Sequence, residues 1–211
     1  MSTMITKDVS CPNCGEPHSV DIITSINAHD NPELKEKVLD ESLFDFRCDR
    51  CNYTCQVTWP LVYHDPDAGF MVIMYAQGQT GNAAEPPATL RNVVKRRVST
   101  LAELKEKVLI FDNGLNDVAV EMVKDALWKI IEKTYQNASV EPYFSKKNID
   151  GSLEFAIYLQ GSENPVYHTI KSEVYNQSAE VLRSLDYKEE NDFTQVGREL
   201  AEKLLEEYKG E

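Results

Sequence analysis

The sequence lacks any long apolar run. No window approaches the ~18 uninterrupted apolar residues that indicate a membrane-spanning helix. Its first ten residues, MSTMITKDVS, contain neither an apolar segment nor the small-residue cleavage site of a secretory signal. We therefore expect a soluble, cytoplasmic protein with no membrane partner.

Positive charge is also scarce. The chain carries 22 Lys and Arg against 35 Asp and Glu, for a net charge of −13. A negative surface repels phosphate backbones at long range, so we expect no nucleic-acid partner. The one basic cluster is Arg91, Lys95, Arg96 and Arg97. On a strand these side chains would point to both faces, which favours pairing with the chain's own carboxylates over a phosphate-binding stripe.

Catalytic motifs are missing too: the sequence has no phosphate-binding loop, no GxSxG and no second metal cluster. His64, Asp65 and Asp67 do bring together groups suited to acid/base chemistry. The same residues fit an ordinary hairpin turn in which aspartate caps its own backbone, and we favour that interpretation. A turn folded back over the cysteines would give His64 a supporting role there. We predict no catalytic residue and favour a non-enzymatic role.

The composition predicts a globular chain, with 42% hydrophobic and 27% charged residues. Its 211 residues exceed the usual single domain. Residues 77–90 (QGQTGNAAEPPATL) combine Gly, Asn, Ala and a Pro pair with almost no large apolar residue, as a linker does. The predicted fold class is α+β. We expect an N-terminal zinc-ribbon-like β domain with a short helical insert over residues 1–80, a linker over 81–90, and an α+β, largely helical domain over 91–211.

Hydrophobic periodicity and capping signals predict the individual elements. A Thr100 to Glu103 capping box, for example, starts one helix. Strands are predicted over 18–28, 42–47, 53–59, 70–76, 91–99, 153–159 and 166–170. Helices are predicted over 32–39, 101–110, 115–135, 172–185 and 193–208. The strands at 53–59 and 70–76 are expected to form a hairpin.

Four of the five cysteines stand in two CxxC pairs, Cys11 with Cys14 and Cys48 with Cys51. Two CxxC turns can each supply two thiolates to one tetrahedral zinc ion. The 33 residues between the pairs accommodate a strand, a helix and a strand that return the chain to its start. We therefore predict one structural zinc ion held by these four residues.

The residues after each pair support two matched turns, since Gly15 follows the first and Asn52 the second. A turn that aims backbone N–H groups at the sulfurs often needs a positive φ there, which Gly and Asn tolerate best. The alternative is a redox dithiol, in which one CxxC exchanges disulfides. Cys55 and His18 are further candidate ligands, but Cys55 fits a small buried hydrophobe and His18 a strand-start residue. Neither enters the predicted site.

The run from Ile5 through Tyr75 resembles the CpXC family of bacterial and archaeal proteins, named for two Cys-Pro-x-Cys motifs. The similarity rests on CPNCGEPHSVDIITSINAHDNPELKEKVLDESLF, the second CxxC and PLVYHDP. Residues 90–127, including EKVLIFDNGLNDVAVEMVKDAL, are similar to what often follows this domain. The chain departs from the pattern at Asp49, where the second proline would stand. The resemblance implies zinc binding and no assigned activity, and it leaves residues 138–211 uncovered.

The sequence thus predicts a zinc-binding module, most simply an interaction or adaptor protein whose partner is another protein. Two alternatives stay open. One is an enzyme, either a thiol oxidoreductase that uses a CxxC pair or a hydrolase that uses the His64 region, and the other is a nucleic-acid-binding zinc ribbon. The sequence specifies neither the partner nor the oligomeric state.

Overall fold

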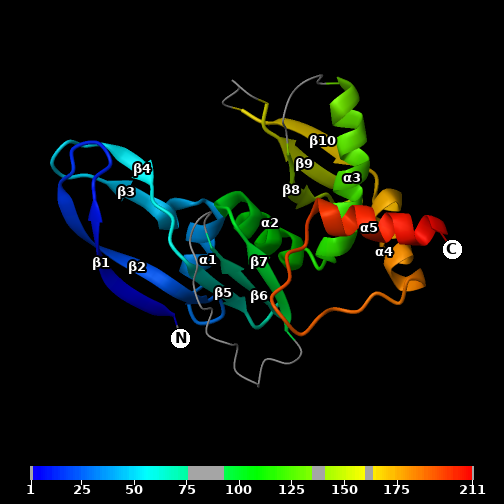
Figure 1. Cartoon of the computed structure of the whole chain (residues 1–211), viewed down its shortest axis with the longest axis horizontal. Coiled ribbons are helices and arrows are strands. Elements are labelled where there is room, and N and C mark those ends of the chain that lie inside the picture. The colour runs from blue at the N-terminus through cyan, green and yellow to red at the C-terminus, as the bar shows by residue number, and fades with distance from the viewer. Residues whose placement is uncertain (1, 76–92, 135–140, 160–163, 211) are drawn as a thin grey trace. The chain divides into compact units, whose positions relative to one another are not determined.

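The computed structural model describes residues 2–75, 93–134, 141–159 and 164–210. It is a mixed α+β fold that divides into two compact units (Figure 1). Unit 1 comprises residues 1–105 and 191–194, and unit 2 comprises residues 106–190 and 195–211. The predicted linker at 81–90 lies outside the described residues. Residues 94–105, predicted to start the second domain, belong to unit 1.

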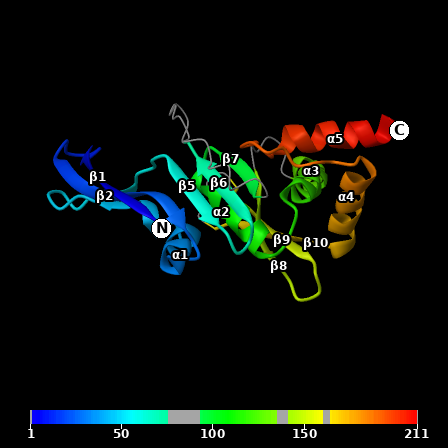
Figure 2. The same cartoon turned by 90° about the horizontal axis from the view of Figure 1, so that it is seen from below.

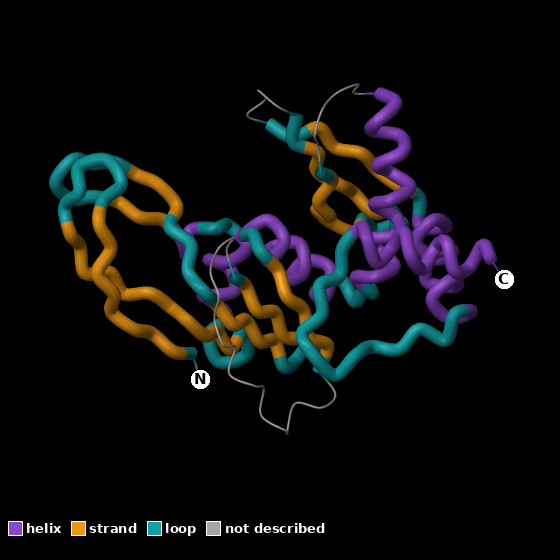
Figure 3. The backbone as a smooth tube through the Cα atoms, in the orientation of Figure 1, coloured by secondary structure: helices purple, strands orange, loops and turns teal. Residues whose placement is uncertain are grey.

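Unit 1 is built on a five-stranded mixed sheet in the order β1-β2-β5-β6-β7. Its strands are β1 (Thr3–Ser10), β2 (Pro17–Asn27), β5 (Leu61–Asp65), β6 (Phe70–Met74) and β7 (Val94–Val98). β1 pairs with β2 along its whole length, whereas β2 pairs with β5 only over Ser25 to Asn27. The first part of β2 therefore extends with β1 as a two-stranded ribbon beyond the rest of the sheet (Figure 3).

The segment between β2 and β5 supplies the remaining elements of this unit. They are α1 (Pro32–Leu39), a 3-10 turn (Ser42–Phe44), β3 (Asp45–Arg47) and β4 (Thr54–Gln56). β3 and β4 form a separate two-stranded antiparallel sheet. Phe44 and Trp59 pack together with ring centroids 4.9 Å apart, and the Trp59 indole N–H donates to the Ile23 carbonyl at 2.7 Å. These contacts attach the segment to β2.

Unit 2 packs helices on one face of a three-stranded antiparallel sheet in the order β10-β9-β8. The strands are β8 (Pro142–Lys147), β9 (Leu153–Ile157) and β10 (Val166–Ile170). The helices are α2 (Leu101–Asp112), which begins in unit 1, α3 (Asp117–Thr134), α4 (Ser172–Ser184) and α5 (Arg198–Gly210). The α3 side chains Val123 and Leu127 pack on Phe155 of the sheet, and α3 also contacts α4 and α5 (Figure 2).

Several predicted elements are corrected by the structure. Strand 53–59 is confined to Thr54–Gln56, and the strand that pairs with β6 in the hairpin is β5. The last helix begins at Arg198 rather than 193, because Thr194 instead forms a bridge with Arg96 of β7. Strands β1, β5 and β8 were not predicted. The α+β class is confirmed. The structure does not confirm the zinc-ribbon-like description of the N-terminal part, nor a largely helical C-terminal part, because the described part of residues 91–211 contains four strands, β7 to β10, beside its helices.

None of the helices in the described ranges is long and apolar enough to cross a membrane.

Candidate metal centre

The two CxxC pairs occupy the turns of two hairpins in unit 1. Cys11 and Cys14 lie between β1 and β2, and Cys48 and Cys51 lie between β3 and β4. We call residues 11–16 the first knuckle and residues 48–53 the second knuckle. Figure 3 shows the two loops together, at the end of the β1–β2 ribbon. The chain topology therefore places two equivalent turns opposite each other.

The knuckles share one backbone hydrogen-bond pattern. In the first, Cys11 N–H donates to the Glu16 carbonyl at 2.8 Å and Gly15 N–H donates to the Cys11 carbonyl at 2.9 Å. The equivalent bonds in the second run from Cys48 N–H to Tyr53 at 2.9 Å and from Asn52 N–H to Cys48 at 2.8 Å. Each pattern closes a tight turn that points both of its cysteine side chains to the same side.

Both turns require a left-handed residue at the position after the second cysteine. Gly15 has φ 72° and Asn52 has φ 55°, as the sequence predicted for these two residue types. The local sequence of each knuckle is thus suited to the conformation it adopts.

The four sulfurs converge on one point. The Sγ atoms of Cys11, Cys14, Cys48 and Cys51 all lie within 4.8 Å of one another. Cys11 Sγ is 3.7 Å from Cys51 Sγ, and Cys14 Sγ is 3.7 Å from Cys48 Sγ. Four sulfurs at 2.3 Å from a tetrahedral zinc ion are separated by about 3.8 Å, whereas a disulfide needs about 2.05 Å. The spacing fits a metal-sized tetrahedron, and each short contact joins the two knuckles.

The surroundings of the sulfurs shift the pKa values of Cys51 and Cys14 in opposite directions. The pKa of Cys51 is lowered to about 6, first by the Asn13 side-chain N–H and then by the Tyr53 backbone N–H. The Glu16 backbone N–H also acts to lower the pKa of Cys14, but burial and hydrogen bonds with the other thiols raise it to about 12. A thiolate therefore forms readily at Cys51, whereas a bound cation would be needed to deprotonate Cys14 near neutral pH.

Contacts between the knuckles hold the centre closed. Asn13 Nδ2 of the first knuckle lies 3.5 Å from Cys51 Sγ of the second, and Arg50 forms an ion pair with Glu16. Cys11 and Cys48 are buried against Phe46. In metal sites, hydrogen bonds and contacts to the ligands from surrounding side chains hold those ligands in the orientation that binds the ion.

His18 and Cys55, which the prediction left out of the site, both lie beside it. His18 Nε2 is 3.2 Å from Cys48 Sγ. Cys55 pairs across the β3–β4 hairpin with Phe46 and packs on the apolar side of the centre. The sequence does not reveal the contact between His18 and Cys48, because it joins β2 to the second knuckle, 30 positions later in the chain.

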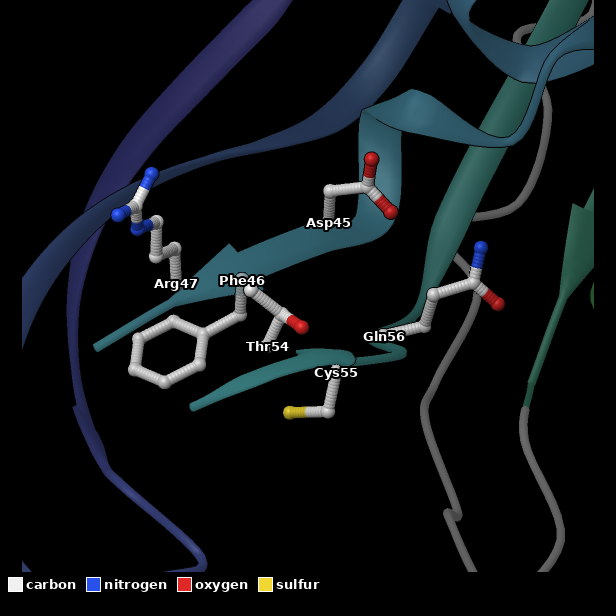
Figure 4. Close-up of a pocket in the computed structure, with 6 residues that line it drawn as sticks. All are labelled: Asp45, Phe46, Arg47, Thr54, Cys55 and Gln56. Carbon is white, nitrogen blue, oxygen red and sulfur yellow. The ribbon is translucent and has the colours of Figure 1, made fainter. Parts of the chain in front are cut away.

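A cavity of about 480 Å³ lies along the β3–β4 hairpin next to the second knuckle. Figure 4 shows Phe46 and Cys55 extending from neighbouring strands to the same side of the hairpin. The cavity is lined by Asp45, Phe46, Arg47, Thr54, Cys55 and Gln56.

The His64–Asp67 turn is remote from the cysteines. His64 pairs with Asn27 at the far end of β2, about ten residues and ~33 Å along the strand from the first knuckle. Asp65 Oδ1 accepts the backbone N–H groups of Asp67 at 3.1 Å and Ala68 at 3.0 Å. The residues form the capped hairpin turn that the sequence favoured, and the supporting role over the cysteines is excluded.

The basic cluster is not a phosphate-binding stripe. Lys95 and Arg96 are buried in β7. Lys95 Nζ donates to the Asn191 side-chain oxygen at 2.7 Å, so an amide takes the place of the expected carboxylate. Arg91 lies outside the described residues.

Two matched CxxC knuckles with four converging sulfurs define a protein with a candidate tetrathiolate metal centre. The chain belongs to the CpXC family, because the family model described as "CpXC protein" matches residues 9–124, more than half of the chain. The match includes all four cysteines and strands β2 to β7. Comparisons with curated proteins and with solved structures gave no match.

Proposed function

We propose that the chain is a zinc-ribbon-like binding module, in which one zinc ion holds the two knuckles together and the folded chain serves as an adaptor for another protein. The main support for the zinc ion is the 3.7 Å distance between sulfurs of the two knuckles, in both the Cys11–Cys51 and the Cys14–Cys48 pairs. Four thiolates at this spacing are the ligand set of structural zinc sites.

The donor set argues for a structural rather than a catalytic ion. Soft thiolates favour zinc over oxygen-preferring cations such as magnesium or calcium. Four protein sulfurs also fill every position of a tetrahedron, so no position is left for a reactive water. A zinc ion bound here would contribute folding energy and no hydrolytic chemistry.

Apart from the proposed metal ion, few buried contacts hold the two knuckles together. Among the described residues, the buried members of the apolar cluster at the knuckles are Cys11, Phe46 and Cys48, and smaller, partly buried side chains such as Val20 and Val57 pack against them. A core this small does not stabilise two hairpins against each other without a metal or disulfides. All five cysteines are free thiols.

Metal analysis of the full chain tests this part of the proposal. Under native mass spectrometry, the wild-type protein should carry one zinc ion, and Cys11→Ser and Cys48→Ser should each lose it. Cys55→Ser is the matched control and should keep the ion, because Cys55 lies outside the four-sulfur cluster. Wild-type protein that folds without metal would refute the proposal.

The lowered pKa of Cys51 favours a second candidate function, thiol–disulfide exchange. Metal-free protein would then form a reversible Cys48–Cys51 disulfide and reduce a small disulfide such as oxidised glutathione. The zinc module predicts that protein purified under reducing conditions retains its ion and shows no such exchange. Exchange by the zinc-loaded protein would favour the oxidoreductase.

The adaptor part is supported by an open sheet edge in unit 1. β7 is covered by residues 191–194, where Arg97 N–H donates to the Thr194 carbonyl at 2.8 Å. Among the described residues, the other edge strand, β1, pairs only with β2 and exposes Met4 and Ile5. An extended segment of another protein can add to an edge of this kind through main-chain hydrogen bonds.

A photo-crosslinking residue at position 4 tests this surface. We expect one discrete adduct with a single partner protein, which disappears when Ile5 is changed to Lys. The same probe at Tyr208, an exposed position on α5, is the control. Identical products from both positions, or no product from position 4, would argue against the adaptor role.

A further inference from the structure

His18 lies beside the four-cysteine cluster but is not one of its members. Its Nε2 atom lies 3.2 Å from Cys48 Sγ, so the contact joins β2 to the second knuckle. Cys48 is fully buried, with a relative exposure of 0%. Water therefore does not reach this sulfur, so any hydrogen bond to it comes from a protein group.

The His18 ring is held in place by packing. It meets the Phe46 ring edge to face, with centroids 5.4 Å apart and an interplanar angle of 75°. Phe46 is itself buried in the apolar cluster at the knuckles. A ring fixed in this way presents Nε2 to Cys48 without a large loss of side-chain freedom.

The position of His18 has a counterpart in the second knuckle. His18 follows Cys14 by the same interval that separates Cys55 from Cys51. The strand pairings match as well, since Val9 pairs with His18 and Phe46 pairs with Cys55. The β1–β2 and β3–β4 hairpins are thus equivalent in backbone at this position. Their side chains differ, because His18 offers a nitrogen donor and Cys55 does not.

A metal-bound thiolate carries no proton, so the hydrogen between His18 and Cys48 must reside on the nitrogen. Four thiolates and one divalent cation have a net charge of −2, in a chain that is already at −13. An N–H donor withdraws electron density from the sulfur and reduces the cost of burying this charge. Removing such outer partners lowers metal affinity about 10- to 100-fold in known sites.

We propose that His18 is a positioning residue whose Nε2–H donates to the Cys48 thiolate and thereby sets how tightly the tetrathiolate centre holds its metal. The inference rests on the proposed zinc site. His18 is not a ligand in this arrangement, and Cys55 cannot replace it because its thiol is a weak donor.

Nuclear magnetic resonance of the wild-type full chain tests the donor directly. Protein with ¹⁵N-labelled histidine is loaded with ¹¹³Cd in place of zinc. We expect His18 to be protonated at Nε2, with that proton protected from exchange. An unprotonated Nε2, or a one-bond coupling between ¹¹³Cd and His18 nitrogen, would overturn the proposal, the latter by making His18 a ligand.

Substitutions test the consequence for the metal. His18→Phe keeps the packing on Phe46 but has no donor, and it should bind zinc about 10- to 100-fold more weakly in competition with a chromophoric chelator. Its Co²⁺ form should absorb at longer wavelength in the sulfur-to-metal charge-transfer band, because the sulfur retains more electron density. His18→Gln, whose amide N–H can donate, should recover part of both effects. His29→Phe, which removes an exposed histidine of the same unit, should match wild type.

The outcomes separate this inference from the function on which it rests. Wild-type protein that binds no metal would remove the proposed zinc site. Wild-type protein that binds one zinc, with unchanged affinity and spectrum in His18→Phe, would overturn the role of His18 alone. Weaker binding without a spectral shift would also overturn it, because loss of packing alone has that result. The ¹¹³Cd experiment decides the question if His18→Phe does not fold.

Discussion

Gly15 and Asn52 occupy equivalent positions in the two knuckles and share a left-handed backbone, with φ of 72° and 55°. They are different residues, but they are the two types that best tolerate this conformation. The equivalence shows that each knuckle is specified by its own short sequence.

Substitution of these two residues should have unequal effects on stability. A Cβ at Gly15 would meet no atom within 4 Å, so the cost of Gly15→Ala is backbone strain alone, about 1–2 kcal/mol. Asn52→Gly keeps the left-handed backbone and should cost less, since it removes only the exposed hydrogen bond that Arg47 donates to the Asn52 side chain at 3.1 Å. Thermal unfolding of the zinc-loaded protein measures both, and Gly197→Ala, at a glycine without positive φ, is the control. A Gly15→Ala variant as stable as Gly197→Ala would show that the knuckle does not require the left-handed turn.

Asp65 should stabilise unit 1 in a pH-dependent way. Burial acts to raise its pKa, but the Ala68 N–H and the Lys35 ammonium, 3.0 Å away, lower it overall. A lowered folded-state pKa means that the stabilisation is complete above the unfolded value of about 3.9 and is lost as pH falls through the folded value. We expect Asp65→Asn to lose about 1–3 kcal/mol at pH 7 and progressively less below pH 4.

Urea unfolding across pH 3 to 7 measures this difference. Asp67→Asn is the matched control, because Asp67 lies in the same turn but is exposed and pairs with His29 at 2.8 Å. A deficit in Asp65→Asn that stays constant down to pH 3 would contradict the assignment.

Lys124 of α3 is the centre of a buried charge network in unit 2. Its Nζ lies 3.0 Å from Glu106 and 3.2 Å from Glu121, and all three side chains are at most 5% exposed. Burial acts to lower the pKa of Lys124, but Glu106 and Glu121 raise it overall, so the ammonium stays charged. Lys124→Met leaves two buried carboxylates without this cation and should cost about 3–5 kcal/mol.

Lys129→Met provides the comparison on the same helix. Lys129 pairs with Asp125 at 2.6 Å, but its side chain is 60% exposed, and exposed pairs contribute only about 0–1 kcal/mol. Chemical denaturation monitored in unit 2 should therefore separate the two variants clearly. Equal losses would mean that the network contributes no more than a surface ion pair.

Local signals in the sequence predicted much of the fold. The capping box is present, with Glu103 N–H donating to Thr100 Oγ1 and Thr100 N–H donating to the Glu103 carboxylate, both at 3.1 Å. The CxxC spacing predicted the proximity of the four cysteines, which the structure shows. These features depend on residues close in sequence or on a strong chemical constraint.

Features that depend on distant contacts were missed. β1 has almost no buried face, so its sequence carries no alternating pattern to mark it as a strand. By sequence pattern, charged residues such as Glu106 and Lys124 are expected on the exposed faces of amphipathic helices. In the structure both are buried and pair with each other. His18 meets Cys48, 30 positions later in the sequence, only because the β1–β2 and β3–β4 hairpins come together. No local rule contains that information.

In the proposed function a metal ion keeps the two knuckles folded, and hydrogen–deuterium exchange of the full chain tests this most directly. The zinc-loaded protein and protein treated with chelator under reducing conditions are compared. Removal of metal should abolish protection at the hydrogen-bonded amides of Cys11, Gly15, Cys48 and Asn52, and should leave α3 of unit 2 protected. Equal protection of these four amides with and without zinc would contradict a structural metal centre.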